Sequence, residues 1–142
     1  MDIEKQIFDK IRFTDHVSFA EIERLVDDSH IDKEFDHSFK SKKYKNIFFW
    51  VSRKKVIIDS IVKLIREDKI QLKPTTKFIY LIDGHMLNMP LAKKGMDYKN
   101  PRWCPVILSP TEKYKPTKNE SELYNKGEIE LLNNQIGMDT HE

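Results

Sequence analysis

The residues with the clearest chemical potential lie in one basic and aromatic stretch, FKSKKYKNIFFWVSRKK, which runs from Phe39 to Lys55. It holds seven cationic and five aromatic side chains in seventeen residues. Lysines and arginines bind phosphates and exposed aromatic rings stack on bases, so this composition is typical of a nucleic-acid surface. The same letters also fit a buried strand flanked by two solubilising charge clusters.

The residues that we predict to contact nucleic acid are the cations of this stretch and of the segments after it. Some precede the apolar run, some follow it, and others lie on the outer face of the next expected helix or near an expected hairpin tip. They are Lys40, Lys42, Lys43, Lys45, Arg53, Lys54, Lys55, Lys63, Arg66, Lys73 and Lys77. Three cations at a helix start oppose the helix dipole, and either a bound phosphate or a nearby acidic helix would relieve that repulsion.

The aromatic residues of the stretch cannot all face a ligand. Tyr44 is placed to stack on a base. Neighbouring residues of a strand point to opposite faces, so Phe48, Phe49 and Trp50 divide between two sides. We expect Phe49, or the pair Phe48 and Trp50, to lie in the core.

Charge is distributed unevenly along the 142 residues. Residues 1–37 carry a net charge of −6, residues 38–110 carry +11 and residues 111–142 carry −3. A segment as basic as 38–110 attracts polyanions, and salt weakens that attraction. The alternative is that the acidic N-terminal third folds against the basic middle and neutralises it.

Other kinds of chemistry have little support. His16, His30 and His37 lie among aspartates but lack metal-ligand spacing, so we expect no metal site. Four scattered glycines cannot form a phosphate-binding loop. Cys104 has no base near it in sequence that would activate it as a nucleophile. The sequence therefore predicts a protein that is not an enzyme and needs no cofactor.

The single cysteine and the lack of long apolar runs bear on location. One cysteine cannot form an internal disulfide. No run approaches the ~18 apolar residues of a membrane span, and the N-terminus lacks the pattern of a secretory signal. We expect a cytoplasmic protein that does not enter the membrane.

Apolar spacing and capping residues predict three helices and a strand in the first part of the chain. Asp2 would cap a helix that ends near residue 12. Ser18 and Glu21 have the spacing of a capping box and predict a helix over 19–28. Residues 27–41 are polar and predict a loop. The run 46–51, NIFFWV, predicts a buried strand, and Ser52 would cap a helix over 53–68.

The remaining residues of the expected domain predict short strands. Residues 70–73 alternate, FIYLI at 78–82 resembles a strand, and Asp83-Gly84 favours a type I′ hairpin turn. Residues 104–108, CPVIL, could add an edge strand. The fold class is therefore α+β, with three helices and a small antiparallel sheet or hairpin. Residues 1–110 would form one compact domain, and residues 111–142 a polar appendage that is disordered, a docking helix or a partner-binding segment.

This order of elements is close to that of a winged helix. Residues 53–68 would be the recognition helix, and the 70–82 pair would be the wing, with Lys73 and Lys77 near its tip. About twenty residues separate the second helix from the third, whereas a standard helix-turn-helix has a tight turn there. The sequence therefore predicts either a decorated winged helix or another small α+β fold.

Four stretches, HVSFAEIERL, NIFFW, YLIDGHMLNMPLA and NPRWCPVIL, carry a resemblance to a known group. They resemble small proteins described as pathogenicity island proteins of staphylococcal mobile elements, over about residues 1–110. The resemblance implies a part in replication, regulation or interference with phage or host, and it supplies no catalytic residues.

Two functional hypotheses follow. In the first, the protein is a DNA-binding accessory or regulatory protein that binds duplex or single-stranded DNA through the cations named above. A homodimer would then match a palindromic site. In the second, the protein is a module that binds a replication or transcription protein through its acidic N-terminal helices or the segment from Leu123 to Ile136.

Overall fold

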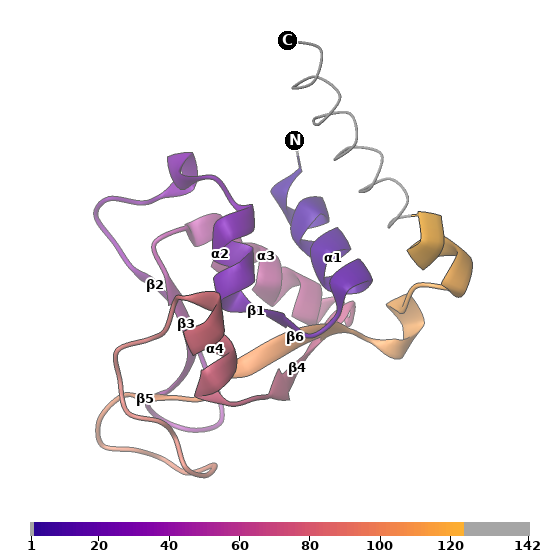
Figure 1. Ribbon diagram of the computed structural model, residues 1–142. Coiled ribbons are helices and arrows are strands. Elements are labelled where there is room, and N and C mark those ends of the chain that lie inside the picture. Colours follow the sequence, from indigo (N-terminus) through magenta and orange to yellow (C-terminus); the bar gives the residue numbers. More distant parts are fainter. Residues whose placement is uncertain (1, 124–142) are drawn as a thin grey trace.

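The computed structural model describes residues 2–123, which form an α+β fold with two small sheets (Figure 1). The helices are α1 (Ile3–Thr14), α2 (Phe19–Leu25), α3 (Lys55–Arg66) and α4 (Lys77–Asp83), with short 3₁₀ helices η1 (Asp28–His30) and η2 (Glu112–Tyr114). The strands are β1 (Val17–Ser18), β2 (His37–Lys40), β3 (Ile47–Ser52), β4 (Ile70–Pro74), β5 (Arg102–Trp103) and β6 (Val106–Pro110). The predicted fold class is confirmed.

The two N-terminal helices begin at the residues whose side chains cap them. Asp2 accepts a hydrogen bond from the Lys5 backbone N–H at 3.3 Å. Ser18 Oγ accepts from Glu21 N at 3.2 Å, and the Glu21 carboxylate accepts from Ser18 N, which completes the capping box. Both helices are confirmed, although α2 ends at Leu25 because Val26 is extended.

The first sheet has the order β1-β6-β4 and is antiparallel throughout. Leu108 of β6 lies opposite Val17 of β1 on one side and Leu72 of β4 on the other. Helix α1 precedes β1, α2 follows it and α3 precedes β4, while the last strand lies between the other two. This order of elements resembles that of a winged helix, with residues 26–54 inserted between α2 and α3 and residues 75–105 inserted between β4 and β6.

Neither the wing predicted over residues 70–82 nor the hairpin turn predicted at Asp83-Gly84 forms. Residues 77–83 form α4, and β4 pairs with β6 instead. The strand prediction failed because a run of five apolar residues has neither the period of a helix nor that of a strand. In the structure, Tyr80 is the one fully buried side chain of α4. Gly84 does adopt positive φ, at 80°, but as the left-handed cap that ends α4. The prediction of three helices therefore omitted α4.

The second sheet lies in both insertions and has the order β2-β3-β5. Strand β3 confirms the strand predicted at NIFFWV, and it pairs antiparallel with β2 and parallel with β5. The loop predicted over residues 27–41 is wrong in part, because it contains η1 and β2. The alternating exposure of β2 shows that one of its faces packs on the core while the other meets solvent.

Aromatic side chains from both insertions join the two sheets in one core. Trp50 stacks on Phe19 and on Tyr80, with ring centroids 5.6 Å and 5.2 Å apart, and Trp103 meets Tyr80 edge-on. The Tyr80 hydroxyl donates to the Val106 carbonyl and accepts from Phe19 N, so it links α4 to both β6 and α2. Burial raises the pKa of Tyr80.

Lys54 is a buried cation at the junction of α2 and α3. Its Nζ donates to the Glu23 carbonyl at 2.8 Å and to the Val26 carbonyl at 2.6 Å, at the C-terminal end of α2. The Asp28 carboxylate lies 3.2 Å away, and Lys54 itself is the residue before α3 begins. One ammonium group therefore caps α2, where the helix dipole favours a cation, and fixes the start of α3.

The first part of the predicted appendage lies against the domain. Thr111 N donates to the Lys69 carbonyl, Arg12 Nε donates to the Tyr114 carbonyl at 2.7 Å, and Arg12 pairs with Glu120 at 2.7 Å. Residues 118–123 are helical. The rest of the appendage, residues 124–142, lies outside the described residues.

Replacing Lys54 with alanine should lower the free energy of unfolding by about 3 kcal/mol, because it leaves the α2 carbonyls and the largely buried Glu23 side chain without their cation. Urea denaturation followed by fluorescence of the buried Trp50 and Trp103 measures the change. Lys55→Ala is the matched control, because Lys55 is exposed, and we expect a change within ~0.5 kcal/mol. Equal midpoints for the two variants would contradict this role of Lys54.

Candidate nucleic-acid interface

The four lysines of the predicted loop arm lie together at one end of the molecule. Lys40 ends β2, and Lys42, Lys43 and Lys45 lie in the turn that leads into β3; all four are exposed. Ser41 Oγ accepts from the backbone N–H groups of Lys43 and Tyr44, which holds the turn. Lys40 Nζ lies 5.5 Å from the Phe48 ring centroid, so its charged end stays over the surface of β3.

A second basic segment, residues 92–102, lies beside this turn, as the two loops near β5 in Figure 1 show. Lys45 N donates to the Asp97 carboxylate at 2.8 Å, and Tyr98 N donates to the Lys45 carbonyl at 3.0 Å. The Asn46 amide donates to the carbonyls of Tyr98 and Lys99. These bonds join residues up to 53 positions apart in the chain.

The two segments together form a cationic surface, which we call the basic tip. All its cations are exposed or partly exposed, and each segment contributes four of them. They are Lys40, Lys42, Lys43, Lys45, Lys93, Lys94, Lys99 and Arg102. Asp97 is the one carboxylate within residues 40–45 and 93–102, and its oxygen is engaged by Lys45 N. The sequence interpretation did not include the second four cations, because no sequence pattern places residues 93–102 beside residues 40–45.

Tyr98 and Gly95 hold the second segment in place. The Tyr98 hydroxyl accepts from the N–H groups of Lys93 and Lys94 and donates to the Lys94 carbonyl. Hydrogen bonding from the backbone of Lys94, and then of Lys93, holds the pKa of Tyr98 below its ordinary value. A Cβ on Gly95 would lie 2.9 Å from the Tyr44 ring, so glycine allows the two segments to approach this closely.

The aromatic rings of the stretch are used mainly inside the fold. Trp50 is fully buried, and its indole N–H donates to the Glu23 carboxylate at 3.0 Å. Phe49 and Phe48 are partly buried, and Phe49 packs against Phe39 with centroids 5.1 Å apart. Tyr44 packs on Gly95. The prediction that part of this run lies in the core is confirmed.

The cations predicted around α3 are largely neutralised by carboxylates. Lys54 is buried under the end of α2, so its predicted contact with nucleic acid is wrong. Arg53 donates to the Lys33 carbonyl and lies 3.9 Å from Asp36. The hydrogen bond from Lys55 to Asp59, at 2.8 Å, raises the pKa of Lys55.

The outer face of α3 is neutralised further by α1. Lys63 pairs with Glu4 at 3.0 Å, and the hydrogen bond to Glu4 raises the pKa of Lys63. Arg66, in the last turn, is exposed. Acidic residues of the N-terminal third therefore reach α3, as one of the two charge interpretations expected. Within residues 2–123, no ion pair joins them to the basic tip.

The positions expected for Lys73 and Lys77 are wrong, because the hairpin that would carry them does not form. Lys73 lies on β4 opposite Ile107, and Lys77 is the first residue of α4. Neither lies at the tip of a two-stranded wing. Residues 75–105 replace that tip, and the basic tip is built partly from them.

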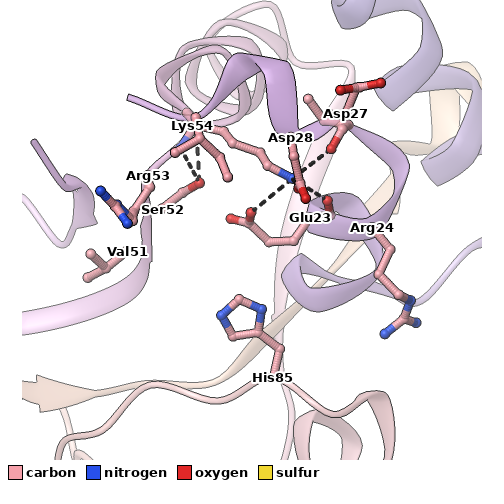
Figure 2. A pocket seen from close by; sticks show the side chains of 11 residues that line it. Glu23, Arg24, Asp27, Asp28, Val51, Ser52, Arg53, Lys54 and His85 are labelled. Atoms are coloured by element: carbon pink, nitrogen blue, oxygen red, sulfur yellow. Dashed lines mark hydrogen bonds and ion pairs between the residues drawn. The ribbon is translucent and has the colours of Figure 1, made fainter. Parts of the chain in front are cut away.

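A cavity of about 640 Å³ lies over the Lys54 junction. Figure 2 shows the ammonium group of Lys54 between Asp28 and Glu23, with His85 across the cavity and the guanidinium groups of Arg24 and Arg53 directed away on opposite sides. Cations and carboxylates occur here in similar number. The lining therefore balances its own charge, and the cavity offers no concentrated field for a ligand of one sign.

The thiol and the metal-ligating side chains of residues 2–123 do not form a reactive site. Burial raises the pKa of the Cys104 thiol, which disfavours the reactive thiolate. Within residues 2–123, no group of three or more His, Cys, Asp or Glu residues is arranged to hold a metal ion. The basic tip is therefore the described surface with the clearest chemical preference, which is for polyanions.

Comparisons with protein-family models, with curated proteins and with solved structures found no match to this chain.

Replacing Tyr98 with phenylalanine should loosen the second segment of the tip. The loss of hydrogen bonds worth ~0.5–1.5 kcal/mol should speed amide hydrogen exchange at Lys93 and Lys94 by roughly 2- to 10-fold, as measured by NMR. Tyr44→Phe is the control, because its hydroxyl has no hydrogen-bond partner among the described residues. Unchanged protection of both amides in Tyr98→Phe would show that the hydroxyl does not hold the segment.

Proposed function

We propose that this protein is a DNA-binding accessory or regulatory protein that contacts the backbone of duplex DNA through the basic tip. The observation that carries the proposal is the joining of two separate basic segments by hydrogen bonds from Lys45, Asn46 and Tyr98. Neither segment alone is more basic than many solvated loops. Together they form a surface with eight cations and one engaged carboxylate.

The composition of the tip favours the phosphate backbone over the bases. Duplex DNA carries one charge per ~1.7 Å of its axis, and lysines bind this charge with little dependence on sequence. Single-stranded DNA is usually bound on exposed aromatic platforms. The two tyrosines of the tip are occupied, since Tyr98 fastens the loop and Tyr44 packs on Gly95. Duplex DNA is therefore the better match.

The same observations argue against α3 as the main DNA-reading element. In a winged helix this helix would enter the major groove. Here Lys54 is buried, and Lys55 and Lys63 are paired with carboxylates that would face phosphates unfavourably. Binding would thus depend on the insertions and not on the winged-helix core.

Four sequence stretches resemble staphylococcal pathogenicity island proteins, and this resemblance suggests that the proposed DNA binding serves a mobile genetic element. A protein of a mobile element that binds DNA without chemistry of its own would act in the element's replication or transcription. The proposal takes no cofactor and no catalytic group.

The test is a titration of labelled duplex and single-stranded DNA at low and moderate salt. We expect duplex binding whose logarithm falls linearly with the logarithm of salt concentration. Lys42→Glu with Lys94→Glu, one change in each segment, should reduce that slope by about 2 and weaken binding to all sequences alike. Lys55→Glu with Arg66→Glu is the matched control on α3, and it should have a smaller effect.

Two results would contradict the proposal. The first is the absence of duplex binding at low salt by the folded wild-type chain. The second is an equal loss of binding in the tip and α3 variants, which would assign recognition to α3. Preference for single-stranded DNA would retain the tip and change the substrate.

A further inference from the structure

Asp97 is the one carboxylate of residues 40–45 and 93–102, and it has the same sign of charge as DNA. An exposed acid among eight cations lowers the positive potential of the basic tip and repels phosphates. On charge alone, its removal would strengthen binding to every polyanion. The contacts of Asp97 indicate a second role, which acts in the opposite direction.

The Asp97 carboxylate connects the two segments of the tip. Its Oδ1 accepts a hydrogen bond from Lys45 N at 2.8 Å, across 52 positions of the chain. The next residue, Tyr98, donates its backbone N–H to the Lys45 carbonyl at 3.0 Å. Residues 97 and 98 therefore hold both polar groups of the Lys45 backbone, which fixes this lysine relative to the second segment.

Within residues 2–123, Asp97 is the one side chain of the second segment that hydrogen-bonds to residues 40–46. The other hydrogen bonds between the segments come from backbone groups and from the Asn46 amide. The Asn46 carbonyl accepts from Arg102 N, so these bonds gather at the start of β3. The bond to Lys45 N reaches farther into the turn, and it therefore restrains the part of the turn that carries the lysines.

Restraint of this turn matters more for a rigid ligand than for a flexible one. The phosphates of duplex DNA lie at a regular spacing. A surface whose cations already hold fixed positions loses less conformational entropy when it binds such a ligand. A single strand or a polyphosphate chain bends to follow the cations, so it gains little from their restraint.

We propose that Asp97 selects duplex DNA over flexible polyanions, because it fixes the two cationic segments of the basic tip relative to each other. This inference rests on the proposed function. The carboxylate lowers affinity for all polyanions through its charge, and it raises affinity for duplex DNA through its hydrogen bond to Lys45 N. Asp97 is thus a positioning residue that determines specificity.

Two variants of equal net charge test the inference. Asp97→Asn removes the charge but keeps an oxygen that accepts from Lys45 N, whereas Asp97→Ala removes both. We expect Asp97→Asn to bind labelled duplex DNA about 2- to 5-fold more tightly than the wild type, because only repulsion is lost. Asp97→Ala should bind duplex DNA about 2- to 10-fold more weakly than Asp97→Asn, which is the effect of one hydrogen bond. For single-stranded DNA and for inorganic polyphosphate, the two variants should agree within about 2-fold.

A second pair of variants and a second measurement serve as controls. Asp59 is an exposed carboxylate on α3 that accepts from the Lys55 side chain. Asp59→Asn and Asp59→Ala should therefore bind duplex DNA with equal affinity. Amide hydrogen exchange at Lys45, measured by NMR, should be roughly 2- to 10-fold faster in Asp97→Ala than in Asp97→Asn, which reports the hydrogen bond itself.

The possible failures separate this inference from the proposed function. Equal duplex affinities of Asp97→Ala and Asp97→Asn overturn the inference alone, and so does an equal loss of affinity for duplex DNA and for the flexible polyanions. A wild-type preference for single-stranded DNA also overturns it, while the tip remains a DNA-binding surface. The absence of duplex binding by the wild type overturns the inference together with the proposed function.

Discussion

The rest of the structure depends on the buried ammonium group of Lys54. In a standard helix-turn-helix, a tight turn fixes the position of the second helix relative to the third. Here residues 26–54 separate α2 from α3. Lys54 replaces the turn with hydrogen bonds, because its Nζ holds the last carbonyls of α2 while its own backbone starts α3. A buried cation is costly unless it is fully paired. Asp28 and Glu23 provide that pairing, and Glu23 in turn holds the indole N–H of Trp50, so the junction is tied to the core.

This constraint explains why the basic middle of the chain divides into two surfaces. Lys54 and Arg53 bring the acidic segment 23–36 over the start of α3, and α1 brings Glu4 to Lys63. The basic tip lies at the start of β3, whereas α3 follows the end of that strand. The tip is formed by the turn before β3 and by residues 92–102. Neutralisation of α3 and exposure of the tip are therefore two consequences of the same packing. The two interpretations of the charge map each describe one part of the molecule.

What could be predicted from the sequence follows from the range of each interaction. Capping bonds join residues three apart, so Asp2, Ser18 and Glu21 located the starts of α1 and α2. The strand at NIFFWV was recognisable because its apolar run is bounded by charges. The FIYLI run failed because it has no period, and Asp83-Gly84 ends a helix as readily as it turns a hairpin. Half of the basic tip was missed because Asn46 is 52 and 53 residues from Tyr98 and Lys99 in the chain, and the pairing of β3 with β5 is what places them together.

The position of the two insertions then decides where new contacts can arise. Outside the insertions, α1 packs on α3 and β6 lies between β1 and β4. Most cations of this part of the chain lie in ion pairs, among them Lys5, Lys10, Arg12 and Lys63. Each insertion begins and ends on that rigid core, and β3 and β5 join them to each other. Loops held at both ends by strands can carry closely spaced cations without unfolding the domain. The charged ends of long lysine side chains lie in water, which weakens the repulsion between them. A surface formed by two insertions exists only when the whole domain is folded. Any activity of the basic tip therefore depends on the Lys54 junction, which holds α2 and α3 together.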